Sequence, residues 1–223
     1  MMENFLRYAA TVSGELLDVH IKGKSLPRIN LSVENPANEG SHLFEFAALE
    51  AYVRRRMEET GSNLLWGGYL ERRALYRASP LFQEEKNPRD IHLGLDFWTA
   101  AGSTVYAPLA GTIHSFQDNN AFKDYGPTVI LRHELQGKVF HTLYGHLSRT
   151  SLEVLEIGQT IQKGQRIGWL GHSAENGNWP PHLHFQIIMD MQDYAGDYPG
   201  VCVLAEVEQY AGNCPDPSLL LGL

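Results

Sequence analysis

Short apolar or alternating runs, broken by glycine and proline, fill the chain from about residue 91 to residue 190. Closely spaced runs of this length, with turn residues between them, are typical of antiparallel β-structure. The runs are STVYAPLAGTIHSF, YGPTVILRH, KVFHTLYGHLS and GQRIGWLG. We therefore predict a mainly β fold with an antiparallel sandwich or open, barrel-like core over residues 91–190.

The segments on either side of this core differ from it. Residues 1–90 are predicted to form a helical and irregular segment, with one helix over 41–59 that ends at Gly61. Residues 191–223 are loop-rich and are expected to pack on the core as a C-terminal extension. Because 223 residues suffice for one substantial core, we expect one domain with attached segments. The apolar stripe of the predicted helix consists of Phe46, Leu49, Val53 and Met57.

Charge and hydropathy argue against two classes of partner. The 18 Lys and Arg against 26 Asp and Glu give a net charge of −8, which disfavours nucleic-acid binding because that binding needs clustered cations. No run of 18 apolar residues is present that could span a bilayer, and no basic leader precedes an apolar run at the N-terminus. The chain as it stands is therefore expected to be cytoplasmic, whereas a piece of a longer exported protein would be extracytoplasmic. Cys202 and Cys214 are expected to be free thiols, and nothing in the sequence fixes an oligomeric state.

Two histidines lie one residue apart in the predicted strand HLHFQIIM. A period of two places Leu183 and Phe185 on one face of the strand, and His182 and His184 on the other. With a rise of about 3.3 Å per residue, the two histidine Cα atoms are about 6.6 Å apart, so both rings can address one small site. A pair of half-exposed surface histidines is the alternative for an isolated motif of this kind.

The run DIHLGLDFW presents a second set of polar side chains. Alternation buries Leu93, Leu95 and Phe97 and leaves His92 and Asp96 on the opposite face. Residues four apart in a straight strand are about 13 Å apart, so these two can share an ion only if the chain bends. Such a bend is least costly at a glycine. The sequence therefore predicts a bend at Gly94, and a structural carboxylate remains the alternative for Asp96 alone.

Two imidazoles and one carboxylate are the ligand composition of catalytic zinc sites, which keep a coordination position open for water. The sequence therefore predicts an open metal site, although spacing leaves undecided whether His182 or His184 binds the metal. In the run TLYGHLS, His146 ends a predicted strand. Only the presence of the other histidines makes it a candidate site residue. Alone it would be assigned a structural or surface role.

Six motifs, taken in order, resemble the lysostaphin-type, LytM-like zinc endopeptidases that cleave peptidoglycan. They are HLGLD, APLAGTI, YGPTVILRH, LYGHLS, GQTIQKGQRIGWLG and PPHLHFQI, and they span about residues 91–190. Each motif is weak on its own, but their combination in this order is specific.

The resemblance implies a role for each candidate residue. His92, Asp96 and His184 would be the zinc ligands, and His182 and His146 would be catalytic histidines without a bond to the metal. It also implies a zinc metalloendopeptidase whose substrate is a peptide, with the stem or cross-bridge peptides of peptidoglycan as the model. In that scheme a neutral His182 accepts a proton from the attacking water, and His146 stabilises the oxyanion as a donor.

The sequence departs from the usual pattern of these enzymes at several places. Gln186 occupies a position at which these enzymes usually have a glutamate. This difference changes the hydrogen bonding that is available to the neighbouring metal ligand, without removing a ligand. The loop HSAENGNWPP brings His172 and Trp179 close to the histidine strand, where they would reshape a peptide groove. A tyrosine often found upstream of the first ligand has no clear counterpart in EEKNPRDI.

Three other functions remain open from the sequence. The glycine-rich run GQTIQKGQRIGWLG also resembles biotinyl and lipoyl carrier modules, which would not need His92 and Asp96. A phosphotransfer protein would use His182 or His184 as its phosphoacceptor. A catalytically inactive module that retains zinc within a larger protein would keep the ligands without the reaction. If the N-terminal segment covers the groove, removal of residues 1 to about 60 is expected to leave activity unchanged or to raise it.

Overall fold

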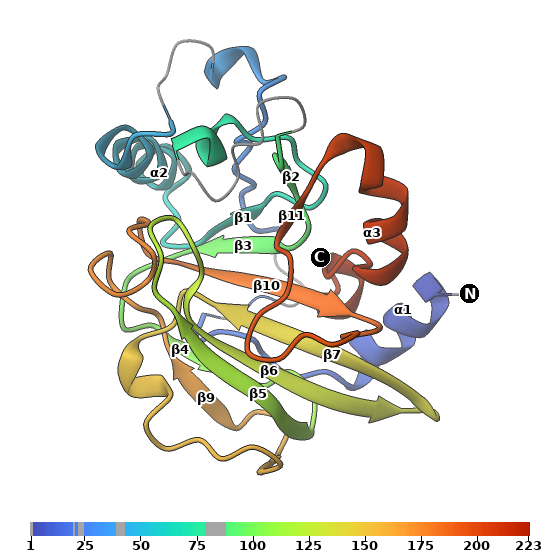
Figure 1. Ribbon diagram of the computed structural model, residues 1–223. Helices are drawn as coiled ribbons and strands as arrows, with labels where there is room; N and C mark the ends of the chain where they lie inside the picture. The colour runs from blue at the N-terminus through green and yellow to red at the C-terminus, as the bar shows by residue number, and fades with distance from the viewer. Residues whose placement is uncertain (1, 20, 22–24, 39–42, 79–87) are drawn as a thin grey trace.

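A seven-stranded antiparallel sheet forms the centre of the computed structural model, which describes residues 2–19, 21, 25–38, 43–78 and 88–223 (Figure 1). The strand order is β1-β3-β10-β7-β6-β5-β8, and each neighbouring pair is antiparallel. The prediction of a mainly antiparallel β fold is therefore confirmed. The strands are β1 (Leu65–Gly67), β3 (Leu95–Trp98), β5 (Gly111–Asn119), β6 (Gly126–Leu135), β7 (Lys138–Gly145), β8 (Thr160–Ile161) and β10 (His182–Ile188).

Two smaller sheets accompany the large sheet among the described residues. Strands β4 (Thr104–Tyr106) and β9 (Arg166–Trp169) pair with each other, and β2 (Ile91–His92) pairs with β11 (Val201–Cys202). The second pair joins the start of the predicted core to the C-terminal extension. The division of the chain into segments at 90 and 190 stays a prediction.

In the part of the chain that the structure describes, four α-helices flank the sheets: α1 (Met2–Val12), α2 (Phe46–Thr60), α3 (Val207–Asn213) and α4 (Ser218–Leu221). Short 3-10 helices are η1 (Pro36–Asn38), η2 (Ala74–Ala78), η4 (Arg149–Ser151) and η5 (Leu204–Glu206). Within the described residues, no helix is long and apolar enough to span a membrane.

Helix α2 is the helix that the sequence predicts. It begins at Phe46, while Ser41 and His42, the first residues of the predicted helix, lie outside the described residues. Gly61 ends it in the left-handed conformation, with φ 62°. The periodicity of residues 1–40 does not predict α1, in which only Phe5, Leu6 and Ala9 are buried.

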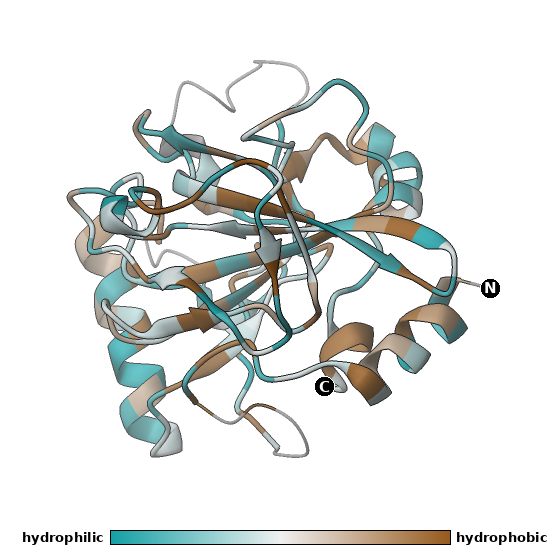
Figure 2. Cartoon of the chain, turned by 90° about the horizontal axis from the view of Figure 1, so that it is seen from below, coloured by the Kyte–Doolittle hydropathy of each residue, from teal (hydrophilic) through white to brown (hydrophobic). Residues whose placement is uncertain are grey.

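Apolar side chains cover both faces of the large sheet. One face packs against the β4–β9 sheet, α1 and α4, through a core that contains Val105, Ile167 and Phe185. The C-terminal segment covers part of the opposite face, where Ile188 and Cys202 belong to a second core. Every residue of β10 is consequently buried. Figure 2 shows the pattern from below, with brown apolar segments along the strands and both colours along the helices.

The chain bends where the sequence predicts it, between β2 and β3. These strands belong to different sheets and are separated by Leu93 and Gly94. Leu95 and Phe97 lie in the first core, as predicted. The prediction that Leu93 shares their face is wrong, because the bend places Leu93 in the second core with Ile188. Cys202 and Cys214 are buried free thiols, as expected.

Candidate metal centre

Three side chains from two strands of the large sheet and from β2 converge on one point. Nε2 of His92 lies 2.9 Å from Nδ1 of His184, and Oδ1 of Asp96 lies 3.3 Å from each of these nitrogens. In a tetrahedral zinc site with bonds of about 2.0–2.1 Å, neighbouring ligand atoms are about 3.3 Å apart. The three atoms therefore have nearly the spacing of one face of such a tetrahedron. All three residues are buried.

The register of the sheet brings two of these residues together. Asp96 on β3 is paired with His184 on β10, so both side chains stand on the same face. Gly94 makes room for the imidazole, because a Cβ at this position would lie 2.7 Å from Cε1 and Nε2 of His184. A glycine is therefore favoured at this position for two reasons. It allows the bend between β2 and β3, and it leaves room for the close approach of His184.

Hydrogen bonds fix which nitrogen of each imidazole faces the convergence point. Nδ1 of His92 donates to the carbonyl oxygen of Gly68 at 2.8 Å, which leaves Nε2 with a lone pair. Nε2 of His184 donates to Oε1 of Gln186 at 2.9 Å, which leaves Nδ1 with a lone pair. Oδ1 of Asp96 is buried and has no hydrogen-bond donor among the described residues. Three electron-pair acceptors thus face one another, an arrangement that a cation between them would stabilise.

A buried arginine holds the other oxygen of the carboxylate. Nη1 of Arg73 lies 2.5 Å from Oδ2 of Asp96, and Nε of Arg73 lies 2.6 Å from Glu71. Burial by itself would raise the pKa of Asp96, but the adjacent His92 imidazole and the Arg73 guanidinium outweigh it and hold that pKa well below its ordinary value. Asp96 is therefore a carboxylate at neutral pH, as a metal ligand must be.

His182 is oriented for proton transfer. Its Nδ1 donates to the carbonyl oxygen of Pro180 at 2.8 Å, so the neutral ring has an acceptor at Nε2, 3.9 Å from Oδ1 of Asp96. The ring stacks on Trp98 with centroids 4.1 Å apart. Burial lowers the pKa of His182 to about 4, so the ring is neutral at pH 7.

His146 lies beside His182, with ring centroids 4.2 Å apart. Its Nδ1 donates to the carbonyl oxygen of Asn176 at 2.9 Å, so Nε2 of the neutral ring is an acceptor too. Burial and the adjacent His182 hold the pKa of His146 well below its ordinary value. The residue has φ 64°, a conformation that non-glycine residues rarely adopt and that occurs at functional sites. Its backbone N–H donates to Tyr125 at 2.8 Å, which holds the strand end in place.

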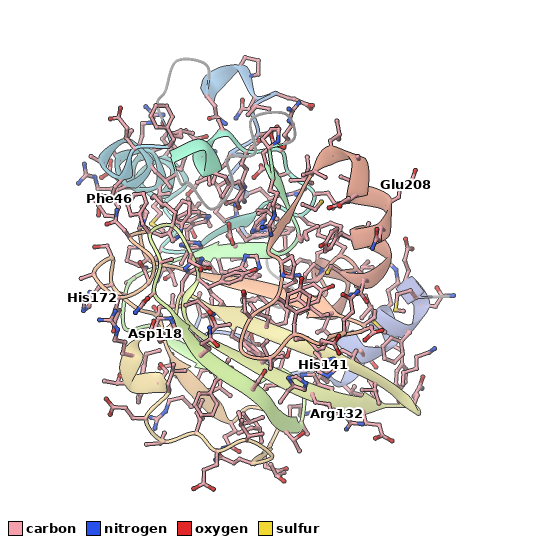
Figure 3. All side chains as sticks on the ribbon, in the orientation of Figure 1. Phe46, Asp118, Arg132, His141, His172 and Glu208 are labelled. Atoms are coloured by element: carbon pink, nitrogen blue, oxygen red, sulfur yellow. The ribbon has the colours of Figure 1, made fainter. Side chains whose placement is uncertain are left out.

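All five predicted site residues line one cavity of about 260 Å³. Its aromatic walls are Tyr76, Trp98, Tyr125, Trp179, Tyr194 and Tyr198. Of the two loop residues expected near the groove, Trp179 lines the cavity. His172 does not, because its side chain is 67% exposed beside Glu175, and Figure 3 shows it at the edge of the molecule.

The sequence did not predict several residues that support the site. Arg73, Glu71 and the carbonyl group of Gly68 come from a stretch with little periodicity, so no pattern links them to Asp96 or His92. Tyr76 is a tyrosine upstream of His92 that stacks beside it, with ring centroids 6.4 Å apart, although EEKNPRDI offers no such residue. The paired glycine in WGGYLERR is the local sequence signal that indicates a close approach of another group to this backbone. There a Cβ at Gly68 would collide with Arg73.

Comparison with known proteins connects this geometry to a family. Residues 90–195 match the model of peptidase family M23. This M23 segment contains all five predicted site residues, whereas Arg73 and Gly68 lie before it. The resemblance to lysostaphin-type peptidases that the sequence predicts is confirmed over this segment.

Individual relatives are distant. An uncharacterized metalloprotease of Haemophilus influenzae is 28% identical over 187 residues, which are 81% of this chain and 36% of the relative. The chain thus spans about a third of the length of that relative. The catalytic domain of the antimicrobial peptidase lysostaphin from Staphylococcus simulans is 26% identical, with a TM-score of 0.43, over 60% of this chain and 81% of that one. A zinc-containing peptidase from Vibrio cholerae is 27% identical, with a TM-score of 0.37, over 49% of this chain and 31% of that one.

Proposed function

We propose that this chain is a zinc-dependent endopeptidase that hydrolyses peptide bonds, with peptidoglycan-type peptides as the substrate class. One observation carries the proposal: a carboxylate oxygen and the two imidazole nitrogens that the bonds to Gly68 and Gln186 leave as acceptors face one another 2.9–3.3 Å apart in a buried site. Such a set has the composition and spacing of a catalytic zinc site with an open position. The match of residues 90–195 to a peptidase family supports the same reading.

The ligands in this proposal are Nε2 of His92, Nδ1 of His184 and Oδ1 of Asp96. Bound zinc would supply a Lewis acid that polarises the peptide carbonyl and lowers the pKa of water to about 7. Hydrogen bonds to Gly68 and Gln186 hold the two imidazoles in the tautomer that such binding needs.

The two remaining histidines would handle protons. His182 is neutral and has its Nε2 lone pair 3.9 Å from Asp96, which suits it to accept a proton from the attacking water. The proton would then pass to the leaving amine. His146 also has only an acceptor at Nε2 in the neutral ring, so it could donate to an oxyanion only after it has taken up a proton. In its neutral form His146 would orient the water by accepting a hydrogen bond.

Metal analysis and peptidase assays of matched variants test the proposal. The purified chain should bind one zinc ion per molecule and cleave peptides from a mixed library that includes glycine-rich and D-alanine-containing sequences. Asp96→Ala should lose both zinc and activity. His182→Ala should keep zinc and lose activity by about 10²-fold or more. Asp118→Ala, a change at a carboxylate outside the cavity, should alter neither property.

Two results would contradict the proposal in different ways. Full retention of zinc by Asp96→Ala would remove the ligand assignment. Stoichiometric zinc without cleavage of any peptide would instead identify an inactive module that retains the metal.

A further inference from the structure

Lys123 is a buried cation in the wall of the cavity. The residue is 3% exposed and lines the same cavity as His182 and His146. Its backbone has φ 66°, and its N–H donates to the carbonyl oxygen of Gly177 at 2.8 Å. The loop that carries Lys123 is therefore fixed by a specific contact, despite a conformation that non-glycine residues rarely adopt.

The ammonium group has only a partial set of partners. Nζ donates to the carbonyl oxygen of Asn178 at 2.9 Å and lies 3.8 Å from the centroid of the Trp179 ring. An ammonium has three N–H donors, and no carboxylate among the described residues forms an ion pair with this one. A buried cation is costly unless an anion accompanies it, so an anion bound beside Lys123 would stabilise the ammonium group.

The acidic residues of the cavity are associated with a different cation. Asp124 and Asp197 also line the cavity, and burial raises the pKa of both while the charge of Arg89 lowers it. Each carboxylate also accepts the backbone N–H of the following residue, at 2.8 Å for Asp124 and 2.7 Å for Asp197. Arg89, rather than Lys123, is therefore the cation whose charge acts on these carboxylates.

Trp179 lies between Lys123 and the two proposed catalytic histidines. Its ring lies 3.8 Å from Nζ of Lys123, and 6.2 Å from the rings of both His146 and His182. These separations place the ammonium within about 10 Å of the two imidazoles, and an extended chain advances about 3.5 Å per residue. A carboxylate bound at Lys123 would thus lie within about three residues of a peptide group placed beside these imidazoles, where the proposed cleavage would occur.

We propose that Lys123 determines substrate specificity by binding a peptide carboxylate close to the scissile bond. This inference rests on the proposed peptidase function. The carboxylate belongs either to a free C-terminus or to an acidic side chain, and Trp179 forms the apolar wall against which the peptide stem packs. Substrates with an amide in place of this carboxylate leave the ammonium without an anion and bind more weakly.

Two matched pairs of probe peptides separate the sources of the carboxylate. The first pair is acetylated penta-alanine with a free or an amidated C-terminus. The second pair is an acetylated and amidated alanine pentapeptide with glutamate or glutamine at its centre. Binding is measured by calorimetry with the metal-free protein, which cannot cleave the probes by the proposed mechanism. Values of kcat/KM are measured with the zinc-loaded protein.

Three variants test the role of the charge. We expect about tenfold or stronger binding of one carboxylate probe over its amide partner, the strength of a charge-assisted hydrogen bond. Lys123→Met should abolish this preference without lowering binding of the amide probes, and Lys123→Arg should retain most of it. Lys138→Met removes a positive charge outside the cavity and should leave the preference unchanged. The thermal midpoints of all variants are compared, and Lys123→Arg keeps the test valid if Lys123→Met does not fold.

The outcomes distinguish this inference from the proposed function. Equal binding of acid and amide probes, or a preference that persists in Lys123→Met, would overturn the role of Lys123 even if the zinc-loaded protein cleaves all four peptides. A preference that depends on Lys123 in a zinc-loaded protein that cleaves neither these four peptides nor the mixed library would support carboxylate recognition and refute the peptidase proposal.

Discussion

Arg73 and Asp96 form a buried ion pair, in which Nη1 of Arg73 lies 2.5 Å from Oδ2 of Asp96. The other carboxylate oxygen, Oδ1, faces His92 and His184 at 3.3 Å. One residue from outside the M23 segment therefore fixes the orientation of a proposed metal ligand inside it. The arginine also reduces the negative charge of the proposed ligand set, so it affects both the folding of the site and its affinity for a cation.

Arg73→Met should weaken zinc binding by about 10- to 100-fold, because the carboxylate loses the partner that orients it. It should also destabilise the metal-free protein by about 3 kcal/mol or more, since a buried charge is left without its counter-ion. Chelator competition and urea denaturation measure the two effects. The control is Arg72→Met, because Arg72 pairs with Asp90 and its side chain is 42% exposed. Equal losses in both variants would refute a specific role for Arg73.

Gly94→Ala should disrupt the proposed zinc site. The new methyl group would lie 2.7 Å from two atoms of the His184 ring, so the imidazole or the strand must move. Zinc affinity should fall by at least about tenfold, the usual effect of misplacing a ligand. Gly212→Ala is the matched control, because a Cβ there meets no atom within 4 Å and the residue lies in α3. It should leave zinc binding unchanged and stability equal or higher by up to about 1 kcal/mol.

The local parts of the site could be predicted from the sequence. Period-two alternation places His182 and His184 on one face of β10, and the glycine in HLGLD marks the bend that allows His92 and Asp96 to approach each other. These features depend on residues within a few positions of one another, which is the range over which strand geometry is fixed.

The supporting contacts could not be predicted in the same way. Arg73 reaches Asp96 across 23 residues, and Gln186 contacts Cys214 across 28. Neither pair has a periodic signature, because each depends on how separate segments pack in three dimensions. The same holds for Leu93, whose assigned face is wrong because the bend at Gly94 interrupts the alternation.

Acid should destabilise the metal-free protein over a defined pH range. Burial lowers the pKa of His92, His133, His141 and His182 to about 4. An unfolded histidine titrates near 6.5, so the unfolded state binds more protons between these values, and the free energy of unfolding falls as the pH drops from about 6.5 to 4. Urea midpoints measured at several pH values test this expectation.

A single variant isolates one of these groups away from the proposed metal site. His133 is buried, with Nδ1 donating to the carbonyl oxygen of Ala110 at 2.8 Å. His133→Gln should reduce the slope of stability against pH by up to one proton, whereas Gln162→Ala, a change of a non-titrating exposed side chain, should leave the slope unchanged. A slope that is unaffected in His133→Gln would show that this histidine is not neutral and buried in the folded state.

Gln186→Glu should separate the stability of the fold from the affinity for zinc. The amide of Gln186 uses both ends: Oε1 accepts from His184, and Nε2 donates to the carbonyl oxygen of Pro199 at 3.1 Å and to Sγ of Cys214 at 3.2 Å. A glutamate keeps the first contact but places a second acceptor against the Pro199 carbonyl group. Because the residue is fully buried, the metal-free protein should lose about 1–3 kcal/mol.

The effect of Gln186→Glu on zinc should have the opposite sign. A carboxylate that accepts the Nε2 proton of His184 makes the imidazole a stronger donor at Nδ1, so zinc affinity should rise although the fold is weaker. Urea denaturation of the metal-free protein and chelator competition for zinc measure the two quantities. Gln162→Glu introduces the same charge at an exposed position and should change neither. Weaker zinc binding by Gln186→Glu would show that the amide, rather than a carboxylate, is what this site needs beside His184.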